Sequence, residues 1–157
     1  MLYYQITMQT GFALSVNPNT TGAELVLAAS NVLDDNQLWG LSFVPSMGGF
    51  AMLNKATNQY AKAVSNSNSA AVIGVPLRPD DPLGDPLATW TLSGAEKPAV
   101  RPVKNSDLNL NARGEKWGPG TPIIIHSWDG GDPNERWSFT FVKDAAAPTA
   151  KVASGAG

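Results

Sequence analysis

The sequence predicts an all-β domain made of three similar units, and two features of the 157-residue chain indicate it. First, 15 glycines and 12 prolines divide the chain into short segments. Several of these segments alternate apolar and polar residues with the period of two that is typical of strands; Tyr4–Met8 and Trp137–Phe141 are clear cases. Second, a pattern marked by tryptophan recurs along the chain. Together the two features favour many short strands over helices.

The internal repeat has a fixed order of features. Trp39, Trp90 and Trp137 lie 51 and 47 residues apart, and each begins a short segment with apolar residues at alternate positions. Upstream of each tryptophan comes a strand start, and between the two lies a small-residue turn followed by an apolar run. The strand starts contain Phe12, Tyr60 and Leu108, which precede their tryptophans by 27, 30 and 29 residues, and the turns begin at Gly22, Ser69 and Gly120. Such self-similarity predicts three copies of one β unit.

We therefore expect one domain over residues 1–143, with units at 2–44, 45–94 and 95–143. A single unit of this kind cannot bury its own apolar face. Three units can do so by closing around a pseudo-threefold axis, which also removes exposed sheet edges. The repeated tryptophans have the largest apolar areas, so we expect them in the shared core. Residues 144–157 are rich in alanine and small residues and contain no aromatic residue, so we expect a flexible tail or linker there.

Composition limits the partners and the compartment. Lys plus Arg number 11 and Asp plus Glu number 13, so the formal net charge is −2. This balance argues against nucleic acid and membrane surfaces as partners, because both require a basic excess. The absence of cysteine excludes disulfides and thiolate metal sites. We see no signal-peptide pattern and no apolar stretch of membrane-spanning length. We therefore expect a cytoplasmic or non-classically secreted protein without a cofactor or a bound metal.

The residues before the repeated tryptophans resemble a known signature. Asn36–Trp39 (N-Q-L-W) matches the Q-x-W motif of ricin-B-type, or R-type, β-trefoil lectins. Asn134–Trp137 (N-E-R-W) differs from it by Glu for Gln, and Ala88–Trp90 (A-T-W) keeps only the tryptophan. The resemblance covers residues 2–143, and the lack of cysteine makes it closest to the cysteine-free members from fungi and bacteria. It implies a β-trefoil fold and a sugar-binding function.

In that family each unit can carry one shallow sugar site, formed by a polar residue on the first strand, an aromatic ring after the second apolar run, and often an Asn before Q-x-W. An aromatic ring packs on the apolar face of a pyranose, and amides or carboxylates pair with its hydroxyls. Ala13 with Ala28, and Ala61 with Val75, lack these groups, so the first two units are not expected to hold a sugar in this way. The third unit keeps them, and the sugar-binding residues expected there are Asn109, Arg113, Trp117, His126, Trp128, Asp129 and Asn134.

Local patterns add expectations about exposure. Asn109 lies between two leucines, so strand alternation places its side chain on the outer face. Trp128 directly precedes a Gly-rich turn, which favours an exposed ring over a core position. The pair Asn36–Gln37 is expected to hold a turn rather than to contact a ligand.

These features favour a lectin for glycans of the galactose or N-acetylgalactosamine type, with one principal site in the third unit. We expect no enzyme activity, because the chain lacks a recognisable nucleophile–base pair and known metal-hydrolase motifs. One alternative is a β-trefoil protease inhibitor or other protein-binding module that acts through the loops Arg78–Leu87 or Arg113–Gly120. Another is a targeting module of a larger toxin or hydrolase. Because one shallow site binds weakly, we also expect a homodimer.

Overall fold

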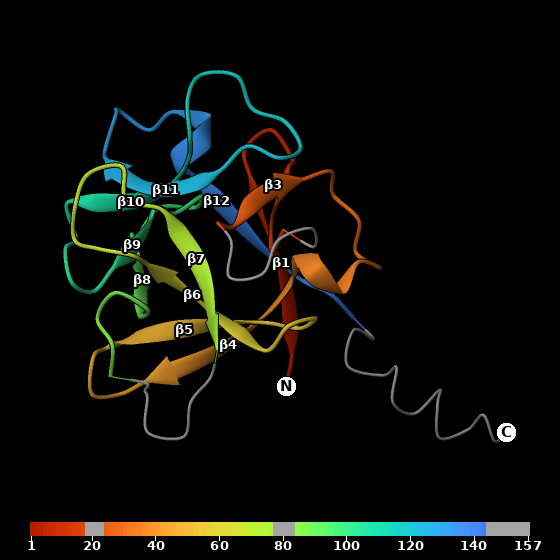
Figure 1. Ribbon diagram of the computed structural model, residues 1–157, viewed down its shortest axis with the longest axis horizontal. Helices are drawn as coiled ribbons and strands as arrows, with labels where there is room; N and C mark the ends of the chain where they lie inside the picture. The colour runs from red at the N-terminus through yellow and green to blue at the C-terminus, as the bar shows by residue number, and fades with distance from the viewer. Residues whose placement is uncertain (18–23, 77–83, 144–157) are drawn as a thin grey trace, which may run out of the picture.

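The computed structural model describes residues 1–17, 24–76 and 84–143 (Figure 1). The predicted tail and most of the Pro-rich loop after Pro76 lie outside these residues. The strands are β1 (Tyr3–Met8), β2 (Ala13–Ser15), β3 (Val26–Ala28), β4 (Leu38–Val44), β5 (Gly49–Asn54), β6 (Gln59–Ala63), β7 (Val72–Pro76), β8 (Trp90–Leu92), β9 (Val100–Pro102), β10 (Leu108–Ala112), β11 (Ile123–Ser127) and β12 (Trp137–Phe141). Two 3-10 turns, η1 (Asp35–Gln37) and η2 (Pro133–Glu135), precede β4 and β12.

Six of these strands form a closed barrel, two from each repeat. β1 pairs with β4, β4 with β5, β5 with β8 and β8 with β9, all antiparallel. β12 pairs with β1 along five residue pairs. The backbone N–H of Trp137 donates to the carbonyl of Pro98 just before β9, at 3.1 Å, which links the last strand to the third repeat's first. Closure of the barrel satisfies the backbone groups that an open sheet would leave at its edges.

The remaining six strands form three hairpins that cap one end of the barrel: β2–β3, β6–β7 and β10–β11. Each hairpin contacts the next through one antiparallel bridge, and the bridges join Glu24 to Ile73, Ala71 to Ile124 and Pro122 to Val26. The three bridges involve corresponding positions of the three repeats. A barrel capped by three such hairpins around a threefold axis is a β-trefoil, so the predicted fold is confirmed.

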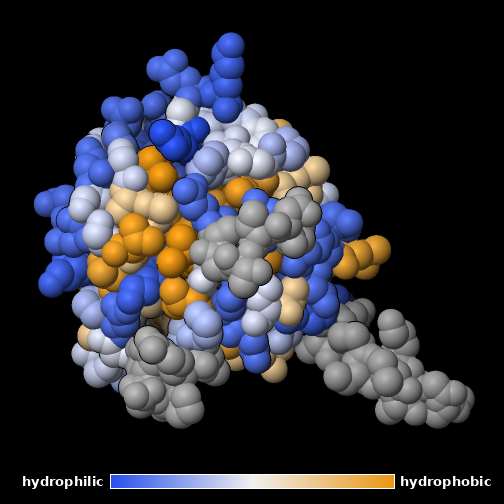
Figure 2. Space-filling model, viewed as in Figure 1, coloured by the Kyte–Doolittle hydropathy of each residue, from blue (hydrophilic) through white to orange (hydrophobic). Residues whose placement is uncertain are grey.

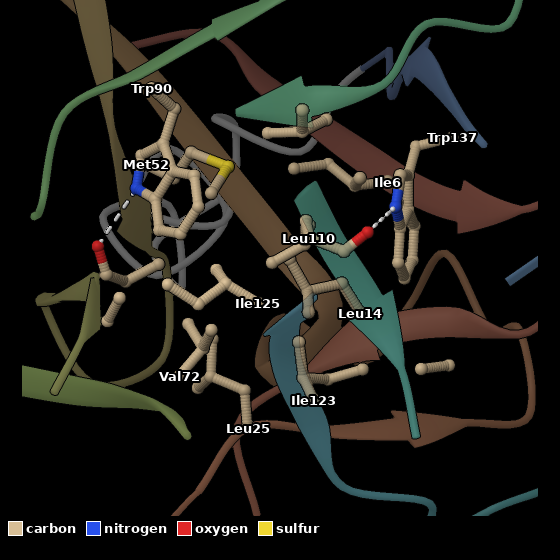
Figure 3. Close-up of a cluster of buried hydrophobic side chains, with 14 of the residues drawn as sticks. Ile6, Leu14, Leu25, Met52, Val72, Trp90, Leu110, Ile123, Ile125 and Trp137 are labelled. Atoms are coloured by element: carbon tan, nitrogen blue, oxygen red, sulfur yellow. Dashed lines mark hydrogen bonds between the residues drawn. The ribbon is translucent and has the colours of Figure 1, made fainter. Parts of the chain in front are cut away.

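The repeated tryptophans lie in the core, as predicted. Trp39, Trp90 and Trp137 each have 0% of their surface exposed. Each indole N–H donates to a backbone carbonyl on the second strand of its own repeat, at 2.9, 3.1 and 3.0 Å; the acceptors are Leu14, Ala61 and Leu110. Figure 3 shows two of these bonds, with the aliphatic side chains packed between the rings. Since a buried Trp requires a partner for its N–H, the three bonds define which residues of the repeats correspond.

A 3-10 turn precedes the core tryptophan in the first and third repeats, and the turn of the first repeat contains Asn36 and Gln37. Gln37 is 2% exposed, its amide N–H donates to the carbonyl of Ala29 at 2.7 Å, and its oxygen accepts from the backbone N–H of Asn31 at 2.9 Å. Asn36 contributes its backbone carbonyl, which accepts from Ser15 and Asn54. The prediction that Asn36 and Gln37 hold a turn is therefore confirmed.

The face seen in Figure 1 has a polar periphery. Figure 2 shows hydrophilic side chains over much of its rim, including the loops at the top of the view that join β10 to β11 and β11 to β12, with hydrophobic side chains nearer the centre. No helix among the described residues is long and apolar enough to cross a membrane.

Candidate functional site

A cavity of about 440 Å³ opens beside the third repeat. Most of its lining comes from β10, β11 and the loops that follow them, and one residue comes from the hairpin of the second repeat. The lining residues are Ser69, Asn111, Arg113, Gly114, Glu115, Ile124, His126, Asp129 and Asn134. Of the seven residues predicted for the site, the cavity brings together Arg113, His126, Asp129 and Asn134.

Two buried amides lie at the bottom of the cavity. Asn111 is 5% exposed and Asn134 is 8% exposed. The side-chain NH₂ of Asn134 donates to the carbonyl of Ala112 at 2.9 Å and to the side-chain oxygen of Asn111 at 3.3 Å. Because a carbonyl can only accept, the Ala112 bond fixes which end of the Asn134 amide is the nitrogen, and this in turn fixes the orientation of Asn111. Within the described part of the chain no other group bonds to the Nδ2 donor of Asn111 or the Oδ1 acceptor of Asn134, so the pair leaves both for the cavity.

The β11 wall of the cavity combines an apolar and a polar side chain. Ile124 lies opposite Asn111 on the paired strand, so both side chains are on the same face of the hairpin. His126 is half-buried, and its Nδ1 lies 3.0 Å from the carbonyl of Ser127. Since that carbonyl can only accept, Nδ1 carries the proton in this contact, and in the neutral ring Nε2 is an acceptor. The wall thus offers a small apolar surface next to a ring nitrogen.

Three charged side chains surround the mouth. Arg113, Glu115 and Asp129 are exposed, and among the described residues none of their charged groups forms an ion pair or a side-chain hydrogen bond. Neutral or charged polar groups that converge on a cavity without mutual pairing are available to a ligand. Within the described residues there is no group of three or more His, Asp or Glu side chains that could hold a metal ion.

A buried carboxylate holds the loop that carries Asp129. Glu135 is 0% exposed, and its two oxygens accept the backbone N–H of Asp129 at 3.0 and 2.9 Å. One of them also accepts from Gly131 at 2.9 Å and from Asp132 at 3.2 Å. Hydrogen bonds to an ionised acceptor are stronger than neutral ones. Glu135 therefore fixes the 129–132 loop and, with it, one side of the cavity.

The same loop positions Trp128, but outside the cavity lining. The Trp128 ring is 41% exposed, which agrees with the prediction that it is not a core residue. The guanidinium of Arg136 lies 5.2 Å from the ring centre, and its Nε donates to the carbonyl of Gly131 at 2.9 Å. One face of the indole is therefore covered by Arg136.

Trp117 is likewise not among the lining residues. It is half-buried, packs against the main hydrophobic core, and donates its indole N–H to the carbonyl of Gly114 at 2.9 Å. In the structure it supports the Arg113–Gly120 loop from within.

The expectation that Asn109 is exposed was wrong. Asn109 is 1% exposed; its oxygen accepts from Arg101 Nε at 3.1 Å, and its NH₂ donates to the carbonyl of His126 at 3.2 Å. All five residues of β10 are buried. Leu108, Leu110 and Ala112 belong to the hydrophobic core, and on the other face Asn109 bonds to Arg101 and Asn111 to Asn134. Asn109 therefore helps to position His126 instead of facing the cavity. Asn111, two residues later, occupies the position in the cavity that was expected for Asn109.

The tryptophan bonds also correct the alignment of the other repeats. Since Leu14, Ala61 and Leu110 correspond, the residue that follows each of them corresponds too, and these residues are Ser15, Lys62 and Asn111. The expected positions Ala13 and Ala61 were therefore not equivalent to one another, and the first two repeats do have a polar residue at the place of Asn111.

In both of those repeats the polar residue is bonded within the protein. Ser15 Oγ donates to the carbonyls of Val16 and Asn36 at 2.8 and 3.2 Å. Lys62 forms an ion pair of 2.6 Å with Asp85. The third repeat differs because its amide pair keeps one donor and one acceptor that no described residue bonds. Sequence analysis missed this difference, along with Ser69 and Ile124 as lining residues.

The fold places the chain in the structural class of the β-trefoils. One of its three repeats carries a polar cavity. No protein-family model and no curated protein sequence matches the chain. Among solved structures it is similar to the designed threefold-symmetric protein ThreeFoil, with a TM-score of 0.76, 21% identity, and coverage of 89% of this chain and 99% of that one.

Natural lectins of known structure share the fold, with TM-scores close to that of the designed protein. The Rhizoctonia solani agglutinin matches with a TM-score of 0.74 and 20% identity, over 89% of this chain and 94% of the agglutinin. The Macrolepiota procera ricin B-like lectin, solved in complex with lactose, matches with a TM-score of 0.70 and 16% identity, over 88% of this chain and 94% of the lectin. The predicted similarity to ricin B-like lectins is thus found at the level of the fold.

Proposed function

We propose that the chain is a carbohydrate-binding lectin with one principal site, the cavity of the third repeat. The observation that carries the proposal is the amide pair Asn111–Asn134, which has a donor and an acceptor without a partner in residues 1–17, 24–76 and 84–143 and lies at the bottom of a cavity. Two neighbouring sugar hydroxyls match such a pair, because one hydroxyl accepts from Asn111 while the other donates to Asn134. The corresponding groups of the first and second repeats are already bonded within the protein.

We propose glycans of the galactose or N-acetylgalactosamine type as ligands. Support comes from the resemblance of the Q-x-W sequences and from the fold shared with a lectin solved in complex with lactose. Ile124 and His126 offer the sugar ring an apolar contact and a further acceptor, and Arg113 and Asp129 are available to the outer hydroxyls.

We propose binding without turnover. The two carboxylates of the cavity, Glu115 and Asp129, belong to exposed loop residues. An acid that protonates a glycosidic oxygen normally lies in an apolar pocket that keeps it protonated, and neither residue has such surroundings. Prolonged incubation with lactose should therefore release no monosaccharide, and release that depends on either carboxylate would contradict this part of the proposal.

A direct test compares equivalent residues of two repeats. We expect Asn111→Ala to weaken binding of galactose and lactose at least tenfold by isothermal titration calorimetry, because the ligand loses its donor and the support of Asn134. Lys62→Ala, at the equivalent position of the second repeat, should leave the affinity unchanged. A glycan array that gives no signal, or equal losses in the two variants, would reject the proposal.

We also propose self-association. A single shallow site buries little ligand surface and binds weakly, and a dimer presents two sites to a branched or clustered glycan. Light scattering should give twice the mass of the chain at micromolar concentration. Monomer at all accessible concentrations would contradict it.

A further inference from the structure

The cavity of the third repeat has one wall from the second repeat. The turn that joins β6 to β7 lies against β11: Ser69 N–H donates to the carbonyl of Ile125 at 2.8 Å, and Ser127 N–H donates to the side-chain oxygen of Asn68 at 3.0 Å. A further bond of 3.0 Å joins Asn66 to Asn105. These contacts fix the position of Ser69, the residue of this turn that lines the cavity.

Ser69 has an unusual backbone for its side chain. Its φ is +70°, in the left-handed region where residues with a Cβ are disfavoured and glycine is not. The corresponding residue of the third repeat is Gly120, with a φ of +91°, whose N–H donates to the carbonyl of Leu27 as that of Ser69 donates to Ile125. The second repeat therefore has a side chain at a position where glycine is the less strained choice.

The strained residue is the one that faces the proposed sugar site. Among the described residues Ser69 Oγ forms no hydrogen bond, so the hydroxyl stabilises no other part of the described fold. Strain retained at a ligand cavity is commonly functional. The position of Ser69, the absence of a partner for its hydroxyl and the glycine in the related turn all point to a role in ligand contact.

The cavity is also wider than one sugar ring. Asn111 on β10 pairs with Ile124 on β11, and Ile124 in turn pairs with Ala71 in the second repeat. The distance from the Asn111 strand to the Ser69 segment is therefore two strand spacings, about 9.5 Å. A pyranose measures roughly 6 Å between opposite hydroxyl oxygens, taking about 1.5 Å for each covalent bond. A ring seated on the amide pair leaves the Ser69 side of the cavity free for a second residue.

We infer that Ser69 forms a second subsite and that the site takes a disaccharide unit or longer glycan in preference to a monosaccharide. This inference rests on the proposed function and names the ligand class of the same site. With lactose as the probe, the galactose ring lies on Asn111 and Asn134, and a hydroxyl of the glucose bonds to Ser69 Oγ. The second repeat thereby contributes specificity to a site that belongs to the third.

The test uses Ser69→Gly, which removes the hydroxyl and relieves the backbone at once. We expect the melting temperature to stay the same or rise, while lactose affinity measured by calorimetry falls about threefold to tenfold, the value of one hydrogen bond, and galactose affinity stays unchanged. The wild-type protein should bind lactose at least threefold more tightly than galactose. A residue needed only for folding would not combine unchanged or higher stability with selective loss of the disaccharide.

The matched control is Asn58→Gly. Asn58 is the other non-glycine residue with positive φ in the described part of the chain, at +59°, and it does not line the cavity. This variant should gain or keep stability and bind both sugars as the wild type does. Equal wild-type affinities for galactose and lactose, or a Ser69→Gly variant that binds lactose normally while Asn111→Ala does not, would overturn the second subsite and leave the lectin proposal standing. Absence of binding to every glycan of an array would overturn both.

Discussion

The residue two places before the core tryptophan differs between repeats in a way that predicts a reciprocal effect on stability. Gln37 in the first repeat donates through its NH₂ to a carbonyl, whereas Glu135 in the third accepts three backbone N–H groups. The two side chains occupy the same place in the fold, and each has an oxygen that accepts a backbone N–H. They differ at the second terminal atom, because the NH₂ of Gln37 meets a carbonyl whereas the second oxygen of Glu135 meets another N–H. Each should therefore be required in its own repeat, and the exchange of either for the other should destabilise the protein.

The magnitudes follow from the contacts. In Glu135→Gln the amide oxygen can replace the oxygen that meets all three N–H groups, so these bonds persist but lose their ionic character. The amide NH₂ takes the place of the other oxygen, whose bond from the Asp129 N–H is lost. Each charged hydrogen bond contributes about 1 kcal/mol more than a neutral one. Because burying a neutral amide costs less than burying a carboxylate, we expect the free energy of unfolding to fall by about 2 kcal/mol. In Gln37→Glu a buried carboxylate would face the carbonyl of Ala29, which lies 2.7 Å from the present NH₂. Its other oxygen could still accept from Asn31 and Gln5, but a buried charge that also faces a carbonyl oxygen and the Asp34 carboxylate should cost about 3 kcal/mol or more.

Urea denaturation followed by tryptophan fluorescence measures both effects, because all three core indoles become exposed on unfolding. Both variants should remain folded without urea if the domain has the ordinary stability of about 5–15 kcal/mol. Glu135→Gln should also weaken glycan binding several-fold, since the loop that carries Asp129 loses part of its support, whereas Gln37→Glu should change stability alone. A change below about 0.5 kcal/mol for either variant, within the range of neutral surface substitutions, would refute this account of donors and acceptors.

Three further substitutions test the geometry around the site. In Gly131→Ala the new Cβ would meet the Arg136 guanidinium at a φ of +89°, so we expect a loss of about 1–3 kcal/mol in urea denaturation; a neutral effect would show that the loop is not fixed. Trp137→Phe removes the indole donor to the Leu110 carbonyl and should cost about 2 kcal/mol or more, and a loss below about 1 kcal/mol in the same assay would contradict the role of that bond. Asn109→Ala removes the acceptor of Arg101 Nε and a donor to the His126 carbonyl, so it should lower stability by about 1–3 kcal/mol with only a secondary effect on binding. A loss of binding at full stability in calorimetry would instead return Asn109 to the ligand contacts.

The fold was predictable from the sequence because its strongest signals are apolar and periodic. Trp39, Trp90 and Trp137 recur at nearly equal spacing, and each fills the same place in the core. The sequence contains a further sign of the repeat: an aspartate stands five residues before each of these tryptophans. In the first two repeats this residue, Asp34 or Asp85, accepts a backbone N–H of the turn.

The site was only partly predictable because its alignment depends on contacts between strands. Alternation places every second residue on the same face, and it predicted an exposed Asn109. It fails on β10, where both faces are covered and Asn109 and Asn111 are both buried. The distances from the corresponding residues Ser15, Lys62 and Asn111 to their tryptophans are 24, 28 and 26 residues, because the loops between them differ in length. No fixed spacing could identify Asn111; the indole hydrogen bonds do.

The divergence of the repeats separates the residues that maintain the fold from those available for binding. In a threefold fold, a group that every repeat bonds internally belongs to the scaffold, as the three indole N–H groups do. A group that two repeats bond internally and the third leaves open is available to a ligand, and among the described residues the Nδ2 of Asn111 is such a group. Ser69 extends the reasoning across a repeat boundary: its side chain is costly to its own turn and faces the cavity of the next repeat. Within one repeat it would look like an imperfect turn residue, and only the packing of two hairpins places it at the cavity.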